Sequence, residues 1–218
     1  VFSFAQDTLG ACDDDSVLLN AATGYANYTW NTGANSSAIY ASSTGTYSVT
    51  ISDGQLPNVN NSLSFDGNDD KVIINSNNLP GGNSARSVSA WFYPESGNGN
   101  IFAYGDGTVS NRRFSVLMTN GNMNFVGETN DHLGHTVTLN QWHLVTITYA
   151  NNELKMYVDG AIVDSTVLGT DLNTDSSYPL VIASNTTTRN DEYFGGKVAQ
   201  VTIWDRVLSA TEVQSQMY

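Results

Sequence analysis

The segment Gln141–Gly160, QWHLVTITYANNELKMYVDG, carries the most regular side-chain pattern of this protein. Between residues 144 and 149 every second side chain is Val, Ile or Tyr, and between residues 154 and 158 every second one is Leu, Met or Val. Alternation with a period of two is typical of strands with one buried face. Asn151-Asn152 separates the two runs, Asp159-Gly160 follows the second, and both pairs suit tight turns. The segment therefore predicts two consecutive antiparallel hairpins.

Trp142 and His143 stand side by side at the start of this segment, and His143 is one of only three histidines. Such a pair belongs either to a functional site or to the packed scaffold. Because His143 opens a predicted core strand, we expect the scaffold role for both residues, with Trp142 as a large core aromatic and His143 as a hydrogen-bonded buried or edge residue.

The composition agrees with a globular all-β protein. Hydrophobic residues make up 40% of the 218 residues, enough for a real core, and only 13% of residues are charged. Gly, Asn, Ser and Thr crowd the segments between apolar runs, as expected for short strands joined by polar turns. The length allows one large domain or two small ones.

The charge balance excludes two classes of partner. Eight basic residues against 21 acidic ones give a formal net charge of −13, which would repel nucleic acid and anionic membrane surfaces. The sequence has no apolar run of 18 or more residues, so we expect no membrane insertion. An acidic surface is compatible with divalent cations such as Ca²⁺.

The first residues leave several alternatives open. VFSFAQDT, at residues 1–8, is compatible with the end of a secretory signal, with a remnant at residues 1–5, and also with an ordinary first strand. Cys12 is the only cysteine, so no intrachain disulfide can form. LGAC, at residues 9–12, has the form of a lipidation box, although Gln6 and Asp7 interrupt the apolar stretch before it. Cys12 is thus free, lipidated or paired with another chain.

Residues 1–53 are predicted to form a small β module. Four short β-like runs, each bounded by Gly, Asn or Ser, lie between residues 16 and 53. Trp30 would be a buried strand tryptophan, and Tyr47 stands where a corner tyrosine is expected in an immunoglobulin-like sandwich. With its Y.W.TG and GTYSVT.SDG patterns, the module resembles the short immunoglobulin-like modules of secreted Bacteroidetes proteins.

Residues 54–60 read as a linker, and residues 61–218 as a double sheet of a dozen or more strands. One short helix is predicted near the C-terminus, where Ser209 and Glu212 have capping-box spacing. Four segments carry a resemblance to the laminin G-like, concanavalin A-like jelly rolls of bacterial extracellular proteins: SLSFDGNDDKVIIN, SVSAWFYP, NQWHLVTITYANNELKMYVDGAIV and FGGKVAQVTIWDRVLSATEV. The resemblance implies a jelly-roll sandwich that serves as a carbohydrate-binding, adhesive or protein-contact module.

The motifs of hydrolytic enzymes are missing from the sequence. Retaining glycosidases of similar fold carry Glu-x-Asp-x-Glu on one strand, which places an acid and a nucleophile about 5 Å apart. Here Asp191 and Glu192 are adjacent, and on a strand they would point to opposite faces. We therefore expect no enzymatic activity.

Calcium is the one cofactor for which the sequence contains a candidate site. FDGNDD places Asp66, Asp69 and Asp70 in one tight loop, and Ca²⁺ is bound by six to eight such oxygen ligands. The resemblance implies a structural calcium that joins this loop to an acidic residue in the last long strand. In this sequence Ala199 and Gln200 occupy the corresponding positions. The alternative is an ordinary Asp/Asn turn.

Three polar loops contain most of the aromatic and charged side chains that the predicted strands do not use. Aromatic faces beside hydrogen-bonding groups are suited to sugar recognition, and function concentrates in loops. The candidate ligand-binding residues are Tyr104, Arg112, His132, His135 and Tyr193. They are expected to converge at one end of the sandwich, and the alternative is that they are ordinary solvated turns.

The sequence predicts an all-β extracellular or cell-surface protein, with an immunoglobulin-like β-sandwich followed by a concanavalin A-like jelly roll. The expected function is non-catalytic binding of a glycan or of another surface protein, with further domains or assembly partners allowed. The alternative is a structural subunit or spacer of a surface assembly that binds no small ligand.

Overall fold

The computed structural model describes residues 16–21, 27–52 and 61–217. The chain divides into two compact units, a smaller one from Val1 to Asn58 and a larger one from Val59 to Met217. The predicted signal remnant at residues 1–5, Cys12 and the predicted linker at residues 54–60 lie outside the described residues.

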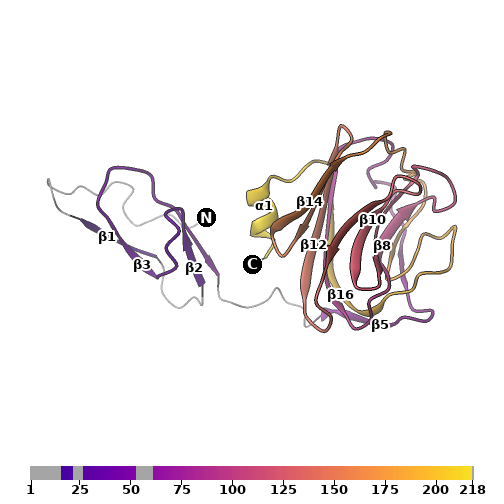
Figure 1. Ribbon diagram of the computed structural model, residues 1–218, viewed down its shortest axis with the longest axis horizontal. Helices are drawn as coiled ribbons and strands as arrows, with labels where there is room; N and C mark the ends of the chain where they lie inside the picture. Colours follow the sequence, from indigo (N-terminus) through magenta and orange to yellow (C-terminus); the bar gives the residue numbers. More distant parts are fainter. Residues whose placement is uncertain (1–15, 22–26, 53–60, 218) are drawn as a thin grey trace. The chain divides into compact units, whose positions relative to one another are not determined.

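The larger unit is a sandwich of two antiparallel six-stranded sheets (Figure 1). The first, called the β9 sheet, has the order β11-β10-β9-β8-β15-β6. Its strands are β6 (Val72–Ile74), β8 (Gly99–Gly105), β9 (Arg113–Thr119), β10 (Asn122–Val126), β11 (His132–Thr136) and β15 (Leu180–Ile182). The second, called the β7 sheet, has the order β14-β13-β12-β7-β16-β5. Its strands are β5 (Leu63–Asp66), β7 (Arg86–Pro94), β12 (His143–Ala150), β13 (Glu153–Val158), β14 (Ala161–Val167) and β16 (Gly195–Trp204).

The two predicted hairpins are confirmed. β12 pairs with β13, and β13 pairs with β14. Asn151 and Asn152 have φ angles of 50° and 65°, and Asp159 and Gly160 have φ angles of 51° and 76°. Two successive residues with positive φ are the signature of the type I′ turn, whose twist matches that of paired strands.

The core lies between the two sheets, as the alternation of side chains predicts. Val145 and Ile147 of β12 are fully buried, and from the β9 sheet Phe114 and Val116 pack in the same cluster. Phe114 also contacts Phe125 edge to face, with ring centroids 5.0 Å apart. Burial of this many aromatic and branched side chains is the main source of stability of a β-sandwich.

The outer face of the β7 sheet is covered in part by the helix α1 (Ala210–Ser215) (Figure 1). Tyr157 of β13 packs there against Leu208 and Val213. The predicted capping box is confirmed, since Ser209 and Glu212 each bind the backbone N–H of the other. Hydrogen bonds from Arg206 and Ser209 lower the pKa of Glu212 to about 2. Within the described part of the chain, no helix is long and apolar enough to cross a membrane.

His143 is a bonded part of the scaffold. Its ring nitrogen Nδ1 lies 2.8 Å from the Asp159 carboxylate, and Nε2 lies 3.0 Å from the Thr138 carbonyl oxygen. The hydrogen bond to Asp159 is the main reason why the pKa of His143 is raised. With both nitrogens engaged and only 8% of the residue exposed, His143 has no free group for a ligand.

The expectation of a core position for Trp142 is wrong. Trp142 precedes β12 and is only partly buried on the outer face of the β7 sheet, where it packs against Trp91 and Leu144. The reason is parity: Leu144, two residues later, also faces outward, whereas Val145 faces the core.

The described part of the smaller unit has two two-stranded antiparallel sheets, β1-β3 and β2-β4. The strands are β1 (Val17–Asn20), β2 (Asn27–Trp30), β3 (Ala38–Ala41) and β4 (Val49–Ser52). Trp30 is buried as predicted, with 1% of its surface exposed. Tyr47 donates a hydrogen bond from its hydroxyl to the Ser43 carbonyl oxygen, at 3.0 Å. A bond of this kind, from Tyr to backbone a few residues upstream, is also made by a corner tyrosine.

Candidate ligand-binding site

The long loop between β15 and β16, residues 183–194, lies along the outer face of the β9 sheet. At its far end Thr186 accepts a hydrogen bond from the Gly107 N–H, at 3.1 Å. On its return the Glu192 carbonyl oxygen accepts a bond from the Asn100 N–H, at 2.8 Å. The loop therefore follows β8 from one end of the strand to the other.

Arg113 holds this loop against the outer face of the β9 sheet. It is the first residue of β9 and alternates with the core residue Phe114, so its side chain lies on the outer face, where only 1% of it is exposed. Its Nη2 atom donates to Asn100 Oδ1 at 2.7 Å and to Glu192 Oε2 at 2.9 Å. Its Nη1 atom lies 3.4 Å from Glu128 Oε2. One guanidinium thus joins β8, the loop after β10 and the loop before β16.

The carboxylates around Arg113 are held by further donors. Glu192 Oε2 also accepts hydrogen bonds from the amides of Asn100 and Asn185, at 2.8 and 2.9 Å. Asn185 donates in addition to Asp191 Oδ1 at 2.7 Å, and Arg189 binds Asp191 Oδ2 at 3.1 Å. We call this set the Arg113 cluster: Asn100, Arg113, Glu128, Asn185, Arg189, Asp191 and Glu192.

Several residues of unusual backbone conformation lie at the cluster. Glu192 has a φ of 56°, Ala183 at the start of the loop has 64°, and Glu128 and Thr129 have 61° and 70°. Residues other than glycine adopt this left-handed region rarely, at a cost of about 1–3 kcal/mol each. The hydrogen bonds of the cluster offset part of that cost.

The cluster is buried at its base and open at its mouth. Side-chain exposure rises from 1% at Arg113 to 22% at Glu128, 35% at Arg189 and 47% at Asp191. Arg113 Nε is buried and has no hydrogen-bond partner among the described residues. The mouth therefore offers charged acceptors and a charged donor in fixed positions, which is suited to binding a ligand with several hydroxyl groups.

Tyr104 cannot contact a ligand, contrary to the sequence-based expectation. It is a residue of β8 with no exposed surface, and its hydroxyl lies 3.2 Å from both the Pro80 carbonyl oxygen and Arg86 Nη1. Burial raises its pKa. The sequence analysis counts Tyr104 in a polar loop, whereas β8 continues to Gly105.

The other predicted ligand residues do not meet at one end of the sandwich. Arg112 precedes β9 beside the end of β8 and lies 3.4 Å from Asp175, whereas Tyr193 is next to Glu192, whose carbonyl binds the beginning of β8. Seven strand residues separate these ends, which is about 20 Å. The ring of Tyr193 faces Lys71, whose Nζ lies 5.7 Å from the ring centroid.

His132 and His135 belong to the edge strand β11 and not to a loop. His132 pairs with Phe125 and His135 pairs with Met123, which are both core-facing residues of β10. A bulge between Met123 and Asn124 allows both pairings, although the two histidines are three residues apart. His132 Nε2 lies 2.8 Å from Asp164 Oδ2 of β14, the edge strand of the other sheet. This contact joins the two sheets along one side of the sandwich. His135 is exposed.

The acidic loop is present as predicted, since oxygens of Asp66, Asp69 and Asp70 lie within 4.8 Å of one another. The reasoning about Ala199 is wrong. Asp66 pairs with Gly195, and Ala199 is four residues further along β16, or about 13 Å away. Ala199 packs against Trp91 on the outer face of the sheet. The identity of residue 199 therefore has no bearing on a cation at this loop.

The cluster was not predicted because its residues come from four separate segments. The sequence analysis names Arg112 as a candidate and not Arg113, although alternation with the core residue Phe114 places Arg113 on the outer sheet face. Asp191 and Glu192 were assigned to opposite faces of a strand, yet both precede β16 and bind the same Asn185 amide. The left-handed φ of Glu192 makes this convergence possible.

The comparison with protein families gives the identity of the larger unit. Residues 66–214 match the family model described as the concanavalin A-like lectin/glucanases superfamily. The chain belongs to this superfamily. No curated protein sequence matches it.

Several solved structures have a fold similar to that of this chain. Domain 4 of AbnA, a GH43 extracellular arabinanase from Geobacillus stearothermophilus, in complex with arabinotriose, has a TM-score of 0.58 and 18% identity, over 72% of this chain and 76% of that one. A SAP-like pentraxin from Limulus polyphemus has a TM-score of 0.56 and 17% identity, over 72% and 81%. A putative carbohydrate binding protein from Bacteroides ovatus has a TM-score of 0.58 and 14% identity, over 83% and 54%. At these identities the likeness concerns the fold.

Proposed function

We propose that this protein is a non-catalytic carbohydrate-binding module, secreted or held at the cell surface, which binds a glycan at the mouth of the Arg113 cluster. The observation that carries the proposal is the graded burial of the cluster. Its base is fixed on the sheet by Arg113, and Glu128, Arg189 and Asp191 reach solvent as charged donors and acceptors. A rigid set of this kind binds vicinal hydroxyls with little loss of side-chain entropy.

Two of the similar structures are described as carbohydrate complexes or binders, which supports a glycan as the ligand class. The superfamily also includes glucanases, so the non-catalytic part of the proposal rests on the site. Glu192 Oε2 already accepts three hydrogen bonds, from Asn100, Arg113 and Asn185. A nucleophile or general acid needs an oxygen that is free to reach the substrate.

The smaller unit would serve as an immunoglobulin-like spacer in this proposal. The buried Trp30 and the bond from the Tyr47 hydroxyl to the Ser43 carbonyl oxygen support an immunoglobulin-like character. The predicted binding roles of Arg112, His132, His135 and Tyr193 stay predictions.

The test is a glycan array followed by calorimetric titration of the full chain. Arg189→Gln should weaken binding of the best glycan at least tenfold, because an exposed charged donor at the mouth is lost. Arg206→Gln is the matched control, since Arg206 is also partly exposed and lies 2.7 Å from a carboxylate oxygen of Glu212, near α1. Equal affinity of both variants and the natural chain would refute the placement. An array without any glycan ligand, or glycan hydrolysis by the chain, would refute the function.

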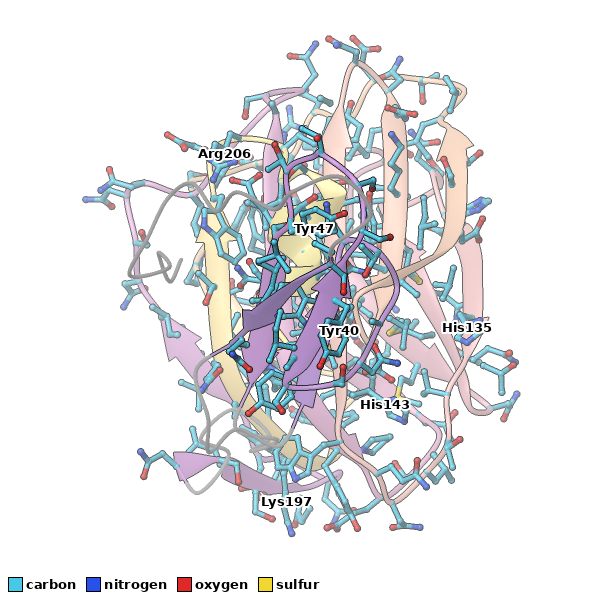
Figure 2. The ribbon with its side chains drawn as sticks, turned by 90° about the vertical axis from the view of Figure 1, so that its left-hand side faces the viewer. Tyr40, Tyr47, His135, His143, Lys197 and Arg206 are labelled. Atoms are coloured by element: carbon cyan, nitrogen blue, oxygen red, sulfur yellow. The ribbon has the colours of Figure 1, made fainter. Side chains whose placement is uncertain are left out.

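A second candidate function is that of an assembly subunit, and one observation favours it. Leu18 and Tyr40 lie directly opposite each other on β1 and β3 of the smaller unit, with 43% and 70% of their surfaces exposed. Tyr40 is labelled in Figure 2. A contiguous exposed apolar patch marks a contact with a neighbouring protein when it is large, and this pair would form its centre. Light scattering of the natural chain and of Tyr40→Ser tests this: a concentration-dependent oligomer that the variant lacks would support it.

A further inference from the structure

The sandwich is open on the side where β5 and β6 form the edges of the two sheets. β16 lies between β7 and β5, yet β5 pairs only with Gly195–Val198. The following six residues of β16, from Ala199 to Trp204, have β7 as their one neighbouring strand among the described residues. In Figure 2, β16 is the yellow strand that runs from near Lys197 toward Arg206. Its other side is thus an unpaired sheet edge.

This edge is interrupted by a bulge and is regular after it. Gln200 has a φ of 50°, and the register with β7 shifts between Ala199 and Thr202. Thr202–Trp204 then pair in register with Ser87–Ser89. In an antiparallel sheet, the N–H and C=O groups of successive residues point to opposite sides. At least one residue of this segment therefore directs its N–H and C=O groups away from β7, to the open side.

An apolar groove lies along the open edge, with a volume of about 450 Å³, which is within the range of ligand pockets. Val201 and Ile203 face it from β16, because they alternate with outward-facing residues and pack partly buried against the core. The side chain of Trp204 packs on the outer face with Leu208 and Val213 instead. Four further apolar residues contribute to the wall: Ile74, Leu79, Pro80 and Leu180. The groove can thus take apolar side chains from a segment that lies along β16.

The opposite side of the sandwich is protected against such a segment, and this side is not. On β14, the edge strand there, Asp164 pairs with the core residue Met156 and lies 2.8 Å from His132 of β11. An inward-pointing charge of this kind is one of the devices that prevent a further strand from adding to an edge. β6 and residues 199–204 contain no charged residue, and Ile74 of β6 is 41% exposed.

We propose that this side binds an extended peptide segment of a partner protein, which adds as a strand beside Thr202–Trp204 and places alternate apolar side chains in the groove. In this mode of recognition, main-chain hydrogen bonds supply the affinity and pockets for alternate side chains supply the specificity. The added strand also covers the exposed apolar surface of Ile74.

The charge of the partner segment follows from the charge around the groove. The lining contains no lysine or arginine, and its one ionisable side chain is that of Asp205. The chain as a whole has a net charge of −13. A segment flanked by basic residues is therefore attracted, and an acidic segment is repelled. A second copy of this chain would bring the same excess of acidic residues, which disfavours it as the occupant.

The test is a chemical-shift titration of the isotope-labelled full chain with the capped peptide Lys-Val-Thr-Ile-Thr-Val-Lys. The peptide should shift the backbone amides of Thr202–Trp204 and of residues 74–79. Ile74→Lys should weaken binding about tenfold, because it removes apolar surface and adds a like charge. Ile162→Lys is the matched control, since Ile162 is 54% exposed on the protected edge strand β14. The same peptide with Glu in place of both Lys residues should bind about fivefold more weakly.

Two N-methylated forms of the peptide distinguish a paired strand from an adsorbed apolar chain. One form carries methyl groups on the amides of the odd-numbered peptide residues and the other on those of the even-numbered ones, so each form blocks one edge of the extended peptide. One of the two forms should bind like the parent peptide, and the other about tenfold more weakly, because its hydrogen bonds to β16 are lost.

Equal affinity of the two methylated forms would overturn the addition of a strand, and equal affinity of Ile74→Lys and the natural chain would overturn its placement. Equal or tighter binding of the glutamate peptide would overturn the stated chemistry of the partner. A concentration-dependent dimer that Ile74→Lys abolishes would make a second copy the occupant and overturn the partner. The absence of shifts along the groove at millimolar peptide would overturn the site. None of these results depends on glycan binding at the Arg113 cluster, so the proposed function stands or falls separately.

Discussion

Replacing Arg113 with Met should destabilise the larger unit by about 3 kcal/mol. The variant loses two charged hydrogen bonds, of 2.7 and 2.9 Å, each with a net contribution of about 1.5–3 kcal/mol. It also leaves Oδ1 of the fully buried Asn100 without the donor that Arg113 supplies. Two effects reduce the total: Met does not require burial of a charge, and Glu192 keeps its two amide donors.

Arg112→Met is the matched control for this prediction. Arg112 is the preceding residue, 41% of its side chain is exposed, and its ion pair with Asp175 is 3.4 Å long. An exposed pair of this kind contributes about 0.2–1 kcal/mol. Both variants delete one positive charge at the start of β9, so the difference between them isolates burial and bonding from net charge.

The assay is denaturant unfolding, with hydrogen exchange of residues 184–192 as a local measurement. Arg113→Met should lower the free energy of unfolding by about 3 kcal/mol and speed exchange across the loop, while Arg112→Met leaves both near their original values. A double-mutant cycle with Glu192→Gln should give a coupling energy above about 1 kcal/mol. If the two arginine variants lose equally little stability, the argument that Arg113 holds the loop is refuted.

Three further predictions concern other parts of the chain. Since the pKa of His143 is raised above 6.5 in the folded protein, its stabilising contribution is full below that pH and is lost as the pH rises through the folded value. The free energy of unfolding should therefore fall between pH 6 and 8 more steeply in the natural chain than in His143→Gln, and parallel curves would contradict this. Trp142→Ala should lower the free energy of unfolding in urea by about 1–2 kcal/mol, because the side chain is only partly buried. A loss above about 3 kcal/mol would mean that Trp142 is a core residue. Calcium at a hundredfold excess over its Kd should add about 2.7 kcal/mol and raise the melting temperature if the acidic loop binds it, an effect that Asp69→Asn should reduce; an unchanged melting temperature would mean an ordinary turn.

The sequence was sufficient for the β-sandwich because its strands obey a local rule. In β12 the side chains of Val145, Ile147 and Tyr149 face the core as the alternation requires, and the turn pairs after β12 and β13 adopt the φ angles that their residue types favour. Trp142 shows the limit of the rule. Its position depends on where the strand begins, and a shift of one residue moves a side chain to the other face.

The candidate site was harder to predict, since it depends on contacts between residues far apart in the chain. Arg113 and Glu192 are separated by 79 positions, and no local pattern links them. Their contact requires the loop after β15 to fold back along β8, which in turn requires left-handed conformations at Ala183 and Glu192. Neither residue type favours that conformation, so the sequence contains no turn signal at these two positions.

A second buried arginine shows how this sandwich fixes its loops. Arg86 of β7 has no exposed surface and, among the described residues, no carboxylate partner. Its donors bind carbonyl oxygens of the segment before β7, with Nη2 2.7 Å from the oxygen of Gly82 and Nε 2.9 Å from that of Ser84. The guanidinium also lies 5.4 Å from the ring centroids of both Phe114 and Tyr149, where cation–π attraction offsets part of the desolvation cost.

Each of the two buried arginines thus holds one loop. Arg113 binds the loop over the β9 sheet, and Arg86 Nη1 donates to the carbonyl oxygen of Pro80 in the segment before β7. Arginine suits this role because its planar fork makes several hydrogen bonds in fixed directions and stays charged when buried. In a chain with only eight basic residues, two fully buried arginines are a substantial share. Their placement under the two loops argues that the shape of these loops, and not only the packing of the sheets, is what the fold maintains.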